Sequence, residues 1–265
     1  MILASASPIP LSLSVAAAAA YAWPALQAQQ LSQRSSRIWV GIAWVLHGVV
    51  LMTAMLGPQP HFGFAPAMSV TAWLVAAVYA VESRFYPQLP TRWTLCALGA
   101  VAVLIGSLFP GNPLLHAASA WLALHLALGV ACYGLIGIAV VHAWFMTRAE
   151  ARFRHAQDPG SGLPLLTLER LTYRFAHAGF VLLSATLLVG LLFGEALYGH
   201  AWRWDHKSVF SVLAWACFAV LAVGRLGLGW RGTRAVYVLY GGSFLLLLAY
   251  VGSRFVSEVV LGRVA

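Results

Sequence analysis

Apolar residues fall into eight runs along the chain, each close to the length that a helix needs to cross a bilayer. A hydrocarbon core of about 30 Å requires about 20 residues at a rise of 1.5 Å per residue. The connections are short and polar, as in Gly57-Pro58-Gln59-Pro60. The pattern predicts an all-α, polytopic transmembrane bundle that forms one integral membrane domain over residues 1–265. The expected spans cover residues 5–27, 38–57, 67–84, 93–110, 120–146, 172–194, 208–228 and 235–256.

The composition excludes a soluble domain. Hydrophobic residues make up 61% of the chain and charged residues only 9%, whereas the surface of a soluble domain needs more charges than that. Basic residues outnumber acidic ones by 16 to 7. Because nearly all of them are arginines in short loops, the excess indicates orientation in a membrane rather than binding of nucleic acid.

The basic residues are concentrated in alternate connections. Twelve of the sixteen fall within residues 34–37, 84–92, 148–174 and 225–234. The positive-inside rule places these connections in the cytoplasm, so both termini are expected on the outer face. The first apolar run ends near a sequence that loosely resembles a signal cleavage site, but no basic residue precedes it. We therefore expect a retained first span.

Histidines are the polar groups that lie deepest in the predicted spans. His47 is expected about 14 Å along its helix, and His125 about 8 Å from the outer side. A neutral imidazole is a good axial ligand for haem iron, and the alternative is a hydrogen bond to a neighbouring helix. Zinc is disfavoured because no HxxxH or HxH pair occurs. The spans contain no carboxylate pair and no charge at mid-depth, which argues against a hydrolase or an ion-coupled transporter.

Two local patterns carry smaller predictions. The cysteines, at positions 96, 132 and 217, lie in apolar runs without a CxxC spacing, so they are expected to be buried hydrophobes rather than a redox site. Thr167 is the expected N-cap of the sixth helix.

The segment from Trp202 to Lys207 holds two indoles, a carboxylate, an imidazole and the single lysine of the chain. It lies between two spans on the face predicted to be outside. A tryptophan-rich segment at this depth is either an interfacial aromatic belt or a platform for a flat hydrophobic ligand.

Four motifs in this sequence resemble a known family. Trp204-Asp205-His206-Lys207 and the later Gly229-Trp230-Arg231-Gly232 resemble the CcsA-type cytochrome c assembly proteins, which handle haem at a tryptophan-rich WWD motif on the outer face. Leu168-Glu169-Arg170 and the segment 249–254 are similar to the eight-span YpjD branch. HemX, a protein tied to control of haem synthesis, belongs to the same broad group. The resemblance covers nearly the whole chain.

The resemblance implies a haem b cofactor and a set of binding residues. His125 matches the family's haem ligand ahead of the WWD segment, and His47 corresponds to an intramembrane haem ligand. Trp202, Trp204 and Asp205 match the WWD core. The remaining expected cofactor-binding residues are His206, Lys207 and His116.

The sequence departs from the family pattern at three places. His206 stands where haem-handling members have Pro, Val223 stands where they have a second intramembrane histidine, and no histidine follows His206. A six-coordinate haem would therefore lack its usual second ligand, for which His116 or His206 can substitute.

Two functions are compatible with these features. The first is a haem-binding assembly factor in the bacterial inner membrane, not an enzyme, that presents haem at the outer tryptophan-rich loop. Its expected partners are the lipid bilayer and other cytochrome c maturation or haem-synthesis proteins, but no nucleic acid. The alternative is a membrane scaffold or regulator, similar to HemX, that keeps the fold without haem.

Overall fold

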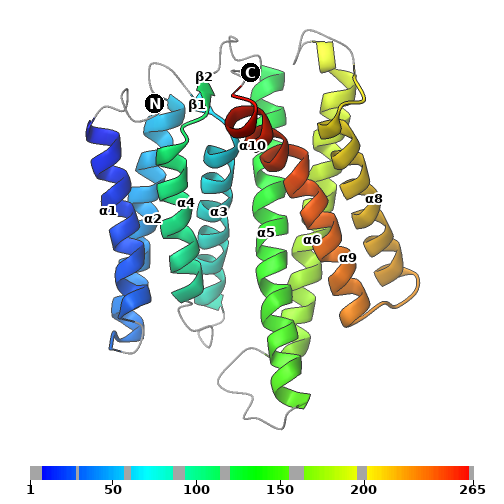
Figure 1. Cartoon of the computed structure of the whole chain (residues 1–265). Coiled ribbons are helices and arrows are strands. Elements are labelled where there is room, and N and C mark those ends of the chain that lie inside the picture. The colour runs from blue at the N-terminus through cyan, green and yellow to red at the C-terminus, as the bar shows by residue number, and fades with distance from the viewer. Residues whose placement is uncertain are drawn as a thin grey trace. The chain divides into compact units, whose positions relative to one another are not determined.

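The computed structural model describes residues 8–27, 30–56, 61–85, 93–113, 120–154, 164–195 and 202–262. The regular structure within them is helical, apart from an antiparallel pair of two-residue strands, β1 (His61–Phe62) and β2 (Asn112–Pro113). The helices are α1 (Pro8–Leu26), α2 (Gln33–Leu56), α3 (Phe64–Phe85), α4 (Trp93–Leu108), α5 (Ala120–Arg154), α6 (Leu165–Leu192), α8 (His206–Leu226) and α9 (Thr233–Leu247) (Figure 1). After α9 the chain continues as η1 (Leu248–Gly252), α10 (Ser253–Phe255) and η2 (Val256–Val260).

Six helices in the described part of the chain are long and apolar enough to cross a membrane. They cover Arg34–Met55, Phe64–Phe85, Leu124–Arg152, Leu165–Leu192, His206–Leu226 and Thr233–Val260. The first and fourth predicted spans form shorter apolar helices, Leu11–Leu26 and Thr94–Leu108. The prediction of an all-α, polytopic membrane bundle is confirmed, while the number of spans and the outer location of both termini stay predictions.

Two helices extend well beyond the predicted spans. α5 continues to Arg154 rather than ending near residue 146, and α6 begins at Leu165 rather than near residue 172. The apolar run marks only the part of a helix that matches the bilayer, so polar turns at its end are missed. The prediction that Thr167 caps α6 is wrong, because Pro164 holds the N-cap position and Thr167 lies within the first turn.

The chain divides into two compact units. Unit 1 contains residues 1–116 and 254–265, and unit 2 contains residues 117–253. The single domain expected over residues 1–265 stays a prediction.

In unit 1, α1 packs against α2 and α4, and α3 packs against α4. The core combines small residues with one aromatic ring: Ala17, Ala20, Tyr21, Ala43, Cys96 and Val103. Two tryptophans join α2 to α3, because each indole N–H donates to the backbone carbonyl of the other residue. The Trp44 bond measures 3.1 Å and the Trp73 bond 2.9 Å, with the rings stacked at 4.6 Å.

In unit 2, α5 packs along α6, α8 pairs with α9, and further contacts join α6 to α8 and α5 to α9. The α5–α6 contact is very close at Gly179, where an added Cβ would lie 2.6 Å from Ile136 Cδ1. The Cys132 thiol donates a hydrogen bond to the Gly179 carbonyl at 3.3 Å. From the next residue of α5, the Tyr133 hydroxyl donates to the Leu246 carbonyl of α9. Side-chain-to-backbone bonds of this kind join helices where water is absent.

The cysteines are free thiols. Cys96 and Cys132 are buried as predicted, whereas Cys217 is partly exposed.

We expect Gly179→Ala to destabilise unit 2 by about 1–3 kcal/mol, because the added methyl group overpacks the contact with Ile136. Thermal unfolding in detergent measures the effect, and Ile136→Ala in the same chain should restore part of it. Gly241→Ala is the matched control, because an added Cβ there has nothing within 4 Å. Equal stability of the Gly179→Ala and Gly241→Ala proteins would contradict the close contact.

Candidate functional site

The tryptophan-rich loop leads directly into α8. Asp205 is the N-cap of this helix, and its carboxylate accepts a hydrogen bond from the Ser208 backbone N–H at 2.8 Å. The rings of Trp202 and Trp204 meet edge to face, with centroids 6.0 Å apart. Trp202 is half-buried, whereas Trp204 is 72% exposed. The loop therefore has one indole against the protein and one facing outward.

His125 and Trp202 meet at a glycine of α6. A Cβ added to Gly190 would lie 3.4 Å from His125 Cε1 and 3.8 Å from Trp202 Cζ3. The two rings thus face the same spot on α6, although the residues are far apart in the sequence. The His125 ring also lies against the backbone of Thr186, one turn earlier on α6. The site is defined by these contacts among α5, α6 and the loop.

Further aromatic rings occupy the same ends of α5 and α6. Trp121, one turn before His125, stacks on Phe193, which ends α6, with ring centroids 3.7 Å apart. An imidazole with aromatic rings around it provides a nitrogen ligand and flat apolar surfaces, which is the chemistry that a porphyrin requires.

The other predicted binding residues of the loop are less enclosed. His206 is the first residue of α8 and is exposed, and Lys207 follows it half-buried. His116 lies outside the described residues, so its predicted role has no structural description.

His47 lies in unit 1 and is fully buried. Its Nε2 is 2.8 Å from the Ser69 hydroxyl, and its Nδ1 is 3.5 Å from the Tyr21 hydroxyl. Both ring nitrogens therefore have partners on neighbouring helices. These contacts favour the alternative of a histidine that joins helices by hydrogen bonds, and the predicted haem ligation by His47 stays a prediction.

A polar cluster at the other end of α8 joins two of the sequence motifs. The Arg225 guanidinium bonds the Glu169 carboxylate at 2.8 Å and the Trp230 carbonyl at 2.9 Å. It also lies over the Tyr173 ring, 3.7 Å from the centroid. The motifs around Glu169 and Trp230 are thus parts of one contact between α6, α8 and the loop after α8.

A comparison with protein families matches residues 42–261 to the family described as cytochrome c assembly protein. The chain belongs to the cytochrome c assembly protein family. The resemblance seen in the motifs is thereby confirmed. The matched region begins within α2 and reaches Leu261, so it includes His47, His125 and the tryptophan-rich loop.

Individual relatives within this family are similar at low identity. The inner membrane protein YpjD of Escherichia coli is 26% identical, with 83% of this chain and 85% of YpjD covered. The cytochrome c biogenesis protein CcsA of Prochlorococcus marinus is 22% identical, with 83% of this chain and 71% of the relative covered. CcsA of a Synechococcus strain is 26% identical, with 83% of each chain covered.

Several contacts of this family member were not predicted from sequence. Gly190 was missed, although an isolated glycine within a helical pattern is a signal for close approach of another group. The N-cap role of Asp205 could have been found, because Asp immediately before a long apolar run is a helix-start signal.

We expect the contribution of the Asp205 N-cap to the stability of the protein to depend on pH. Partial burial raises the pKa of the carboxyl, but hydrogen bonds from Ser208 and the charge of Lys207 outweigh this and hold the pKa below the ordinary 3.8. A lowered pKa in the folded state means that the charged cap stabilises the protein above pH 3.8 and that this stabilisation is lost as the pH falls through the lowered value.

Thermal unfolding measured against pH tests this expectation. Asp205→Ala should cost about 1 kcal/mol at neutral pH, whereas Asp205→Asn should retain most of the cap. The difference between wild type and Asp205→Asn should shrink or reverse on acidification. Parallel pH profiles for these two proteins would show that the carboxylate charge has no role.

Proposed function

We propose that this protein binds haem between α5, α6 and the tryptophan-rich loop and presents it for cytochrome c assembly. Membership of the family supports a role in cytochrome c biogenesis. The observation that supports haem binding is the meeting of the His125 imidazole and the Trp202 indole at Gly190. A glycine at that position lets the imidazole and the indole approach the same point of α6.

The side chains around Gly190 fit haem as a ligand. His125 would hold the iron beside Trp202, and the exposed Trp204 would add a second indole whose plane is nearly perpendicular to that of Trp202. Arg203 in the loop and Lys207 in the first turn of α8 carry the charge that propionate groups require. The second iron ligand is the weaker part of the fit, because one predicted substitute, His206, is exposed and the other, His116, lies outside the described residues. The residues fit haem with one strong ligand.

The protein's own contribution would be binding and orientation rather than catalysis. When bound, haem supplies the group that an apocytochrome attaches through its own thiols. The packing of α5 on α6 would fix the imidazole, and the Asp205 cap would fix the start of α8 and with it the two indoles. We therefore propose that the protein is not an enzyme.

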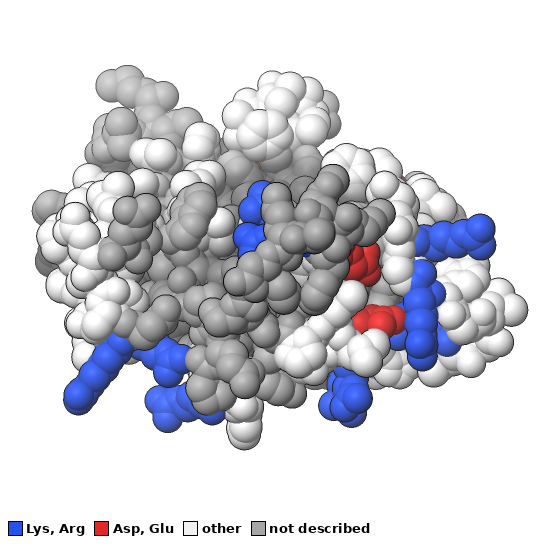
Figure 2. Space-filling view, turned by 90° about the horizontal axis from the view of Figure 1, so that it is seen from below, with Lys and Arg blue, Asp and Glu red and all other residues white. Residues whose placement is uncertain are grey.

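The same proposal includes a location and partners. We place the protein in a bacterial inner membrane with the tryptophan-rich loop on the periplasmic side, and we expect partners among cytochrome c maturation or haem-synthesis proteins. Arg225, Arg231 and Arg234 lie at or just after the opposite end of α8, and among the described residues on the face shown in Figure 2 blue side chains outnumber red ones. That distribution supports a cytoplasmic location for this end, and the name of the YpjD relative supports the inner membrane.

We expect the purified wild-type protein from haem-replete cells to show a Soret band that His125→Ala loses. The physical reason is removal of the iron ligand. His177→Ala is the control, because His177 is exposed elsewhere on α6. His47→Ala should lower stability without removing the band, because its nitrogens bond Ser69 and Tyr21. A wild-type protein without a Soret band would overturn the proposal and favour the scaffold or regulator.

The space at Gly190 gives a second test. Gly190→Ala should keep haem, because the added methyl group would stand at ordinary contact distances from both rings. Gly190→Leu should displace the imidazole or the indole and reduce haem content several-fold. Gly241→Leu controls for adding a leucine to a helix of unit 2, because an added Cβ at Gly241 has nothing within 4 Å. Full haem content in Gly190→Leu would place the ligand elsewhere.

A further inference from the structure

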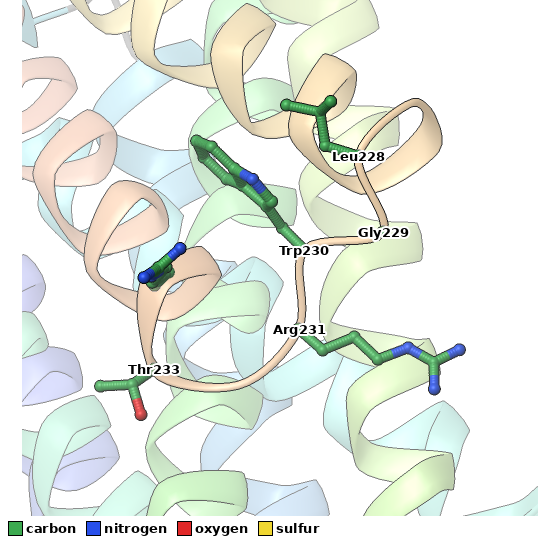
Figure 3. A pocket seen from close by; sticks show the side chains of 6 residues that line it. Leu228, Gly229, Trp230, Arg231 and Thr233 are labelled. Atoms are coloured by element: carbon green, nitrogen blue, oxygen red, sulfur yellow. The ribbon is translucent and has the colours of Figure 1, made fainter.

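The loop between α8 and α9 lines an open cavity of about 510 Å³. Its lining consists of Leu228, Gly229, Trp230, Arg231, Thr233 and Arg234 (Figure 3). The backbone turns at Gly229 and Gly232, with φ of +63° and +64°, values that other residues adopt only with strain. The shape of the cavity is therefore set by the backbone of the loop.

Trp230 forms a fixed wall of this cavity. A Cβ at Gly224 would lie 2.4 Å from Trp230 Cε3, so the indole rests directly on α8. Its backbone carbonyl is held by Arg225. Figure 3 shows the indole directed back toward the helices, whereas Arg231 extends outward from the loop. The loop thus presents a cationic side chain away from an anchored aromatic ring.

The arginines of this region differ in how their charge is compensated. Arg225 is paired with Glu169 at 2.8 Å. Arg231 and Arg234 are exposed, and neither makes an ion pair or hydrogen bond with another described residue. None of the described lining residues is acidic. Two uncompensated guanidinium groups and the Thr233 hydroxyl give this cavity the donors that bind phosphate oxygens.

The position of the loop indicates the source of the phosphate. α8 and the helical segment that begins with α9 and continues to Val260 are both long and apolar enough to span a membrane, so the six residues between them are expected at the depth of lipid headgroups. Leu226 and Leu228 are 83% and 69% exposed beside the cavity. A ligand with an anionic head and apolar chains would satisfy both the arginines and these leucines.

We propose that this cavity binds the phosphate of an anionic phospholipid, through Arg231, Arg234 and Thr233. The ligand chemistry is a phosphate ester, and free phosphate is the competing source. The site lies at the other end of α8 from the tryptophan-rich loop and does not depend on haem binding. Anionic lipids are concentrated in the cytoplasmic leaflet, where this arginine-rich end is expected.

The experiment titrates delipidated full-length protein in a neutral detergent with phosphatidylglycerol, phosphatidylcholine or inorganic phosphate, and follows the thermal unfolding temperature. Phosphatidylglycerol should raise this temperature, with little effect of phosphatidylcholine. In the double variant Arg231→Gln/Arg234→Gln the apparent affinity for phosphatidylglycerol should fall about 10- to 30-fold, because each basic residue contributes about a factor of five near an anionic surface.

The matched control is Arg170→Gln/Arg174→Gln, which removes the same charge from exposed positions on α6. Its affinity should remain near that of wild type. Equal losses in the two double variants would show only general surface attraction and overturn the site. Protection by inorganic phosphate at the same affinity would overturn the lipid assignment, and absence of protection by phosphatidylglycerol would overturn the proposal. The variant Arg231→Lys/Arg234→Lys keeps the charge and should bind phosphatidylglycerol with intermediate affinity. It provides the test if the neutral variant does not fold.

Discussion

The close approach of α5 and α6 is the contact on which unit 2 and its candidate site depend. Between apolar helices in a bilayer, association rests on packing and hydrogen bonds, because lipid tails are as apolar as the side chains. Gly179 provides both packing and a hydrogen bond. Its lack of a side chain lets Ile136 approach closely, and its carbonyl accepts the hydrogen bond from the Cys132 thiol. Gly190, three turns further along α6, then faces the His125 ring. The position of the imidazole follows from the packing of the two helices.

His47 and His125 show why depth in a span does not define a ligand. Each is an imidazole on an apolar helix, and the sequence offered the same two interpretations for both. His47 is fully buried with partners at each nitrogen, which meets the requirement that polar groups away from water be satisfied. His125 is only half-buried and has an indole beside it. The difference lies in neighbours contributed by other helices.

The fold was largely predictable because the eight apolar runs record where helices meet lipid. The extents of α5 and α6 were not, since a helix continues through polar residues once it leaves the bilayer. From the sequence, His125 and Trp202 could be predicted to lie on the same side of the membrane. Their meeting at Gly190 could not be predicted. Its geometry arises from residues distant in sequence, and so does the contact of Arg225 with Glu169 and Trp230. Local patterns contain no information about such partners beyond their side-chain chemistry.

At opposite ends of α8, two family motifs of unit 2 make the same kind of contact, a tryptophan ring packed on a glycine. Trp202 lies over Gly190 before the helix begins, and Trp230 lies over Gly224 after it ends. In each case an indole on a glycine holds a loop against a neighbouring helix. A motif tryptophan is therefore explained in the first place as a loop anchor. What separates the loop before α8 from the loop after it is the group beside the anchored ring, because Trp202 has the His125 imidazole next to it and Trp230 has the paired Arg225. Haem binding by this family member would therefore depend on that imidazole more than on the tryptophans, which reveal the ancestry.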